Sequence, residues 1–132
     1  MNNVRWRQMT IEALEEQDFG NPNEAPTHMV KRCLELCKVP LNQFTVGDLR
    51  LMIEQGFSPQ YLIPLAIEYL HVDIFTEGDF YQGDLLRNVL LVDTKFWTNN
   101  KYLWTEVNEL IKDKRDRLIA AKISTTSFDT IC

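Results

Sequence analysis

The fold is decided by one stretch near the middle of the chain, Ser58-Pro59-Gln60-Tyr61-Leu62-Ile63-Pro64-Leu65-Ala66-Ile67-Glu68-Tyr69-Leu70. Serine followed by proline is typical of a helix cap and first turn, so Ser58 is expected to cap a helix that continues to about residue 71. Pro64 lies six residues into this helix and predicts a local kink, or a first turn that is not α-helical. The helical spacing of apolar side chains predicts one buried stripe, made of Leu62, Leu65, Ala66, Tyr69 and Leu70.

Helix signals also flank this stretch on both sides, because threonine caps, glycine stops and apolar residues at helical spacing recur along the chain. The further helices are expected over about 10–17 (cap Thr10), 27–37 (cap Thr27), 45–55 (cap Thr45, stop Gly56), a segment that starts at Gly83-Asp84, and 101–122. Residues 124–132 are expected to form a frayed tail. The sequence therefore predicts an all-α fold, a single compact domain of about five or six helices over residues 1–132.

The charge of the chain is unevenly distributed. Its 132 residues carry a net charge of −5, and residues 61–93 alone hold six acids against one base, so the remainder is neutral. This balance argues against direct nucleic-acid binding. No apolar run approaches the ~20 residues that span a bilayer, and no apolar region of a signal peptide follows the first residues, so we expect a cytoplasmic protein with no membrane association.

The three cysteines are expected to be thiols rather than disulfides. Cys33 and Cys37 lie four residues apart on one apolar helix face, which predicts reduced core side chains. Only His28 lies near them, which is too few ligands for a metal site. Cys132 is the last residue and is expected to be a free thiol.

No catalytic motif stands out, so the chain is expected not to be an enzyme and to need no cofactor or metal. His28 and His71 lie far apart and neither belongs to a recognisable motif. Asp79 and Asp84 leave three interpretations open, namely helix caps, partner contacts and an acid–base pair.

The segment from Pro40 to Trp97 resembles the immunity proteins of bacterial contact-dependent growth inhibition (CDI) systems. The order and spacing of several short stretches carry this resemblance. The stretches are Pro40-Leu41-Asn42, Phe44-Thr45, Asp48-Leu49-Arg50, Ile53, Gln55, Tyr61-Leu62-Ile63-Pro64-Leu65-Ala66, Glu77-Gly78-Asp79-Phe80-Tyr81, Gly83-Asp84-Leu85-Leu86 and Phe96-Trp97. Within this pattern Gly78 and Gly83 are expected at turns, and the residues expected in the core are Tyr61, Leu65, Leu85, Leu86 and Trp97.

The resemblance implies a cytoplasmic protein that is made beside a large secreted toxin. Such a protein binds the C-terminal domain of the toxin and protects the cell that makes it. Toxin domains of this kind are often nucleases, which implies a partner with a basic surface. The alternative is a helical adaptor or regulatory protein with an unrelated partner.

The residues of the acidic segment independently suggest where a basic partner would bind, because acids alternate there with aromatic side chains. The candidate toxin-binding residues are Asp73, Glu77, Asp79, Phe80, Tyr81 and Asp84. They would block the active site or the substrate surface of the toxin. The other interpretation of the same segment is a solvated acidic loop without a partner.

Overall fold

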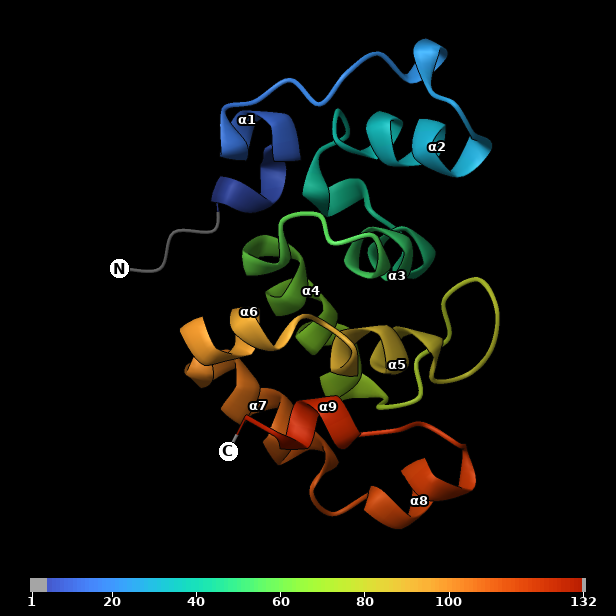
Figure 1. Ribbon diagram of the computed structural model, residues 1–132, viewed down its shortest axis with the longest axis vertical. Coiled ribbons are helices and arrows are strands. Elements are labelled where there is room, and N and C mark those ends of the chain that lie inside the picture. The colour runs from blue at the N-terminus through green and yellow to red at the C-terminus, as the bar shows by residue number, and fades with distance from the viewer. Residues whose placement is uncertain (1–4, 132) are drawn as a thin grey trace.

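A computed structural model describes residues 5–131, and this part of the chain is all-helical (Figure 1). Its α-helices are α1 (Ile11–Glu15), α2 (His28–Leu36), α3 (Val46–Glu54), α4 (Pro59–Val72), α5 (Asp84–Leu90), α6 (Thr94–Asn99), α7 (Lys101–Ile111), α8 (Arg115–Ala120) and α9 (Thr126–Asp129). Short 3-10 turns cover Arg5–Gln8, Pro22–Glu24 and Leu41–Gln43. Five of the described α-helices have seven residues or more, which confirms the predicted all-α class.

Helix α4 is the centre of the domain (Figure 1). It contacts α3, α5 and α7, so it lies between the N-terminal and the C-terminal helices. Its buried side chains are Leu62, Ile63, Leu65, Ala66, Ile67 and Leu70. Because neighbours cover more than one of its faces, Ile63 and Ile67 are buried as well, whereas Tyr69 was expected in the core and is 39% exposed. The helix continues through Pro64.

The predicted caps are confirmed at Thr10, Thr27 and Thr45, each of which accepts a backbone N–H three residues ahead. Asp48 completes a capping box by accepting the N–H of Thr45 at 3.0 Å. Ser58 occupies the predicted cap position and Pro59 the first turn, but Ser58 has a φ of 41° and its buried Oγ makes no hydrogen bond within the described chain. The position is therefore that of a cap, while the side chain does not cap the helix, which begins on Pro59.

The single long helix expected over 101–122 is wrong, since α7 ends at Ile111 and α8 begins at Arg115. The inward stripe of α7 runs through Leu103, Val107 and Ile111 at i, i+4 spacing. The next positions on that face would be Lys114 and Arg115, which are charged. A continuous helix would have carried these charges into the core, so the chain turns and buries Leu118 from a new direction.

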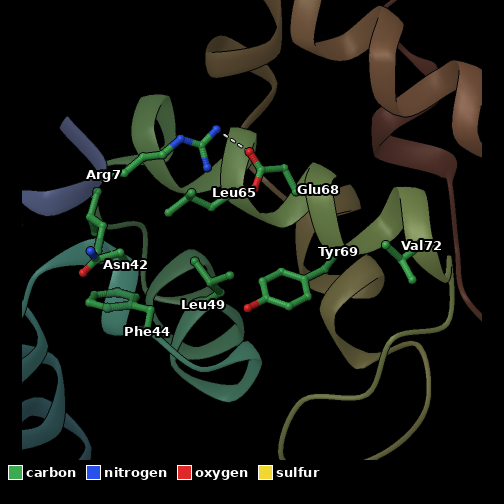
Figure 2. A pocket seen from close by; sticks show the side chains of 9 residues that line it. Arg7, Asn42, Phe44, Leu49, Leu65, Glu68, Tyr69 and Val72 are labelled. Atoms are coloured by element: carbon green, nitrogen blue, oxygen red, sulfur yellow. Dashed lines mark hydrogen bonds and ion pairs between the residues drawn. The ribbon is translucent and has the colours of Figure 1, made fainter. Parts of the chain in front are cut away.

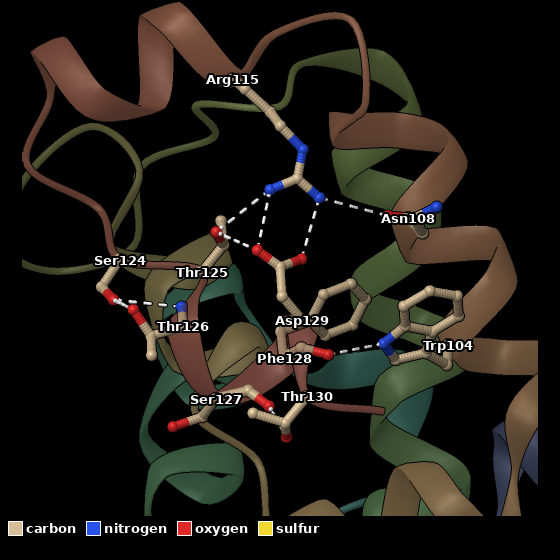
Figure 3. A network of polar contacts seen from close by, with 10 residues as sticks. All are labelled: Trp104, Asn108, Arg115, Ser124, Thr125, Thr126, Ser127, Phe128, Asp129 and Thr130. Atoms are coloured by element: carbon tan, nitrogen blue, oxygen red, sulfur yellow. Dashed lines mark hydrogen bonds and ion pairs between the residues drawn. The ribbon is translucent and has the colours of Figure 1, made fainter. Parts of the chain in front are cut away.

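The frayed tail expected over 124–132 is also corrected by the structure, because α9 is anchored in the core by Phe128, which is fully buried (Figure 3). The Phe128 ring stacks on Trp104 with centroids 5.1 Å apart and meets Trp97 edge-on at 5.3 Å. Trp104 Nε1 donates to the Phe128 carbonyl at 2.8 Å. Arg115 holds the Asp129 carboxylate with two hydrogen bonds of 2.9 Å.

The expected core cysteines and tryptophan are found where the sequence placed them. Cys33 and Cys37 are free thiols and buried, and burial raises the pKa of the Cys37 thiol to about 12. Trp97 is fully buried. Cys132, expected as a free thiol, lies outside the described residues.

Candidate partner-binding groove

The acidic segment, residues 61–93, includes the connection between α4 and α5, which extends at the edge of the molecule in Figure 1 and holds Asp73, Glu77 and Asp79. Asp73 directly follows α4, is exposed, and accepts the N–H of Phe75 at 2.9 Å. Glu77 is exposed and forms an isolated antiparallel bridge with Gln82. Between these two residues the chain reverses direction, so that residues 78–81 form the tip of a tight loop, here called the 77–82 loop.

Asp84 lies beneath this loop rather than on its surface. It is 2% exposed, and its carboxylate accepts the backbone N–H groups of Gly78 at 2.6 Å, Phe80 at 2.9 Å and Tyr81 at 3.4 Å. Only a small part of this carboxylate is exposed, and Asp84 takes part in the groove described below as one of its lining residues. The side chain fixes the backbone of the loop.

Asp79 contacts the first turn of α3. Its carboxylate lies so close to Gly47 that any Cβ at this position would collide with it. Glycine at position 47 therefore allows the loop to approach α3, although the residue Asp79 as a whole remains exposed. Asp79 and Asp84 are not arranged as an acid–base pair. The Asp79 carboxylate lies against the backbone of α3 at Gly47, and both oxygens of the Asp84 carboxylate accept backbone N–H groups.

Arg50 of α3 completes the support of the loop, and the sequence analysis did not identify it. Its side chain is buried, with the residue 7% exposed, and its Cζ lies 4.4 Å from the centre of the Phe80 ring. Guanidinium nitrogens lie 3.6 Å from Glu54 and 3.9 Å from Asp84. A signal existed in the sequence, since Arg50 is four residues after Val46 and three before Ile53, on the inward face of a predicted helix.

Arg50 and Asp84 line a groove of about 730 Å³ between α2, α3, α5 and the 77–82 loop, whereas Asp73, Glu77 and Asp79 lie outside its lining. Its rim carries exposed apolar side chains, namely Met29, Phe80, Tyr81 and Leu91, and Phe80 is 68% exposed. Polar groups of Arg50, Asp84 and Asn88 line it as well, and Asn88 Nδ2 donates to the Arg50 carbonyl at 3.1 Å. Exposed aromatic side chains beside polar groups are a typical composition of protein–protein contact surfaces.

A second hollow of about 350 Å³ lies between the first residues, α3 and α4 (Figure 2). Its lining is largely apolar, with Phe44, Leu49 and Leu65, and an ion pair between Arg7 and Glu68 borders it. It includes none of the candidate toxin-binding residues. The groove at the 77–82 loop contains three of them, namely Phe80, Tyr81 and Asp84.

Within residues 5–131 no group of three or more His, Cys, Asp or Glu side chains could hold a metal ion. His28 and His71 are both exposed. No helix of the described chain is both long and apolar enough to cross a bilayer.

The fold is thus a small all-helical domain with a groove bordered by exposed aromatic side chains. A family model of CDI immunity proteins matches residues 13–118, and the chain belongs to this family. The match includes α2 to α7, the 77–82 loop and Arg50. Comparisons with curated proteins and with solved structures found no match. The family membership favours the immunity interpretation over an adaptor with an unrelated partner.

Proposed function

We propose that this protein binds the C-terminal domain of the CDI toxin made beside it in the cytoplasm, and that the groove at the 77–82 loop forms the centre of the contact. It acts by binding and not by catalysis. The observation that carries the proposal is the position of Phe80, which is 68% exposed while its ring rests on the buried Arg50 guanidinium. An aromatic side chain that is exposed and also held rigidly loses little entropy on binding.

The charge of the neighbouring segment suggests the character of the partner. Asp73 and Glu77 are exposed beside the aromatic residues, and residues 61–93 carry the whole net charge of the chain. Such a surface attracts a basic partner and speeds its association. A nuclease toxin fits this description, because its substrate surface must attract phosphates, and the bound immunity protein would cover that surface.

The test uses the C-terminal domain of the toxin encoded next to this chain. Its affinity for the parent protein and for Phe80→Ala is measured by calorimetry, and protection is measured in cells that express the toxin domain. We expect Phe80→Ala to weaken binding by about 30-fold or more, as truncation of a central anchor does. The matched control is Tyr102→Ala on α7, an aromatic side chain of similar exposure (66%) on another part of the surface.

Loss of affinity in Phe80→Ala together with unchanged binding of Tyr102→Ala would support the site. Equal affinities of both variants would place the contact elsewhere on the immunity protein. A parent protein that neither bound the toxin domain nor protected cells from it would contradict the proposed function itself.

A further inference from the structure

Arg50 is a buried cation whose hydrogen-bonding capacity is largely unused. The residue is 7% exposed, and its Nε is buried without a hydrogen-bond partner among the described residues. Its two ion pairs, at 3.6 Å to Glu54 and 3.9 Å to Asp84, exceed the length of a hydrogen bond. A guanidinium has five N–H donors, and a buried donor without a partner lowers stability.

The carboxylates around Arg50 do not supply the missing acceptors. Asp84 Oδ1 accepts the N–H of Gly78, and Oδ2 accepts those of Phe80 and Tyr81, so both oxygens are already in use. The Glu54 side chain is 46% exposed and remains 3.6 Å away. Arg50 therefore has carboxylates nearby that offset its charge, but its N–H groups lack hydrogen-bond acceptors.

Because Nε itself is buried, an acceptor from outside the chain would meet the Nη groups of Arg50. The Phe80 ring covers one face of the guanidinium, at 4.4 Å from Cζ. The N–H groups lie in the guanidinium plane, so a ring on its face leaves them available. Arg50 also lines the groove of about 730 Å³, which gives a partner side chain access to it.

We propose that the groove receives one acidic side chain of the toxin domain, and that Arg50 selects it by donating hydrogen bonds to its carboxylate. This inference rests on the proposed function and names the chemistry that the partner contributes to the same site. The fork of a guanidinium matches a carboxylate in two parallel hydrogen bonds. Asp84 and Glu54 beside it disfavour a multiply charged group such as a phosphate.

The partner that fits both observations has one carboxylate within a largely basic surface. The exposed Asp73 and Glu77 would face the basic part of the partner surface, and Arg50 would donate hydrogen bonds to its one carboxylate. A partner without that acid would leave the N–H groups of Arg50 desolvated and without an acceptor, which gives the groove a means to discriminate between related toxin domains.

The experiment is a double-mutant cycle between the two proteins. On the immunity protein the variants are Arg50→Gln, which removes the charge, and Arg50→Lys, which keeps the charge but loses the planar fork. On the toxin domain each Asp or Glu is changed in turn to Asn or Gln. Arg32→Gln is the matched control, because Arg32 is an exposed arginine on α2 that does not line the groove.

We expect one carboxylate-to-amide change in the toxin domain to weaken binding to the parent protein by about 30-fold or more. The same change should have little further effect on Arg50→Gln, and Arg50→Lys should recover only part of the affinity. Arg32→Gln should bind within about threefold of the parent.

The proposal would be overturned if every toxin carboxylate could be changed to an amide without a loss of about 30-fold in affinity for the parent immunity protein. This measurement uses only the parent protein, so it remains valid even if the Arg50 variants fail to fold. A responsive carboxylate whose effect persisted in folded Arg50→Gln would also overturn it. In both cases the parent still binds the toxin, so the proposed function stands. Only a parent that does not bind at all removes both.

Discussion

The Asp84 carboxylate accepts the backbone N–H of Gly78 at 2.6 Å across six residues of chain, and this contact sets the shape of the 77–82 loop. The same carboxylate accepts two more N–H groups, from Phe80 and Tyr81. A Cβ at Gly78 would lie 3.1 Å from Asp84 Oδ1 and 3.3 Å from Arg50 Cδ, so the loop backbone fits closely between these two side chains. The exposed aromatic residues are thus presented by a backbone that is fixed from below.

Asp84→Ala should lower the free energy of unfolding by about 3 kcal/mol, because it leaves buried N–H groups without an acceptor and Arg50 without a neighbouring charge. Asp84→Asn keeps one oxygen acceptor and should lose less. Chemical denaturation measures both values, and hydrogen exchange of the amides of residues 78, 80 and 81 reports the loop directly. Unchanged exchange at these amides in Asp84→Ala would show that the loop does not depend on the carboxylate.

The effect of Gly47→Ala on the free energy of unfolding should depend on whether Asp79 is present. Alanine favours a helix over glycine by ~0.5 kcal/mol, but its Cβ collides with the Asp79 carboxylate in the parent protein. In an Asp79→Ala background this collision is absent, so Gly47→Ala should stabilise α3 there and stabilise it less, or destabilise it, in the parent. The four free energies of unfolding form the cycle, and strict additivity would contradict the contact.

The sequence predicted the helical class, three of the caps and the buried positions of Cys33, Cys37 and Trp97, because these depend on local spacing and local hydrogen bonds. It located the acidic and aromatic segment but not the role of each acid within it. Asp84 and Asp73 are the same residue type in the same stretch, and only the fold decides that one is buried and the other exposed.

The errors at the C-terminus have the same origin. Phe128 is a single aromatic residue in a polar stretch, so no periodic pattern marks it as buried. Its place between Trp97 and Trp104 depends on residues more than 20 positions away. Arg50 was missed for the converse reason, since a charged residue near the inward face of a helix is usually assigned to solvent.

Phe128→Ala should lower the free energy of unfolding by about 3–5 kcal/mol, because it empties a fully buried site between two tryptophans. Thermal or chemical denaturation measures the loss, and Ser127→Ala, at an exposed position on the same short helix, is the control. A Phe128→Ala protein as stable as its control would mean that the C-terminal residues contribute nothing to the core.

Asp129 should make the stability of the domain depend on pH in the acid range. Hydrogen bonds from Arg115, seen in Figure 3, hold the pKa of the Asp129 carboxyl below its ordinary value of 3.8. The folded protein therefore releases this proton more readily than the unfolded chain does. The resulting stability is fully present above the unfolded pKa and is lost as the pH falls through the folded one.

Asp129→Asn should therefore flatten the dependence of the unfolding free energy on pH below about 4, while the parent protein loses stability there. Denaturation curves at several pH values provide the comparison. Asp116→Asn removes one exposed carboxylate from the neighbouring helix and serves as the control. If Asp129→Asn followed the same acid limb as the parent, the contact with Arg115 would not contribute to it.

Reversal of Asp73 and Glu77 to lysine should slow association with the toxin domain by about tenfold at low ionic strength and make the rate less sensitive to salt. Both side chains are exposed and neither supports the loop in the way that Asp84 does, so the variant should fold normally. Rim charges act mainly on the encounter of two proteins, so the dissociation rate should change little. Stopped-flow measurements over a range of salt concentrations separate the two rates.

The matched control reverses Glu106 and Asp113, two exposed acids outside the 61–93 segment, which changes the net charge by the same amount. If both double variants slowed association equally, only the total charge would matter, and the acidic segment would have no special part in guiding the toxin to the groove.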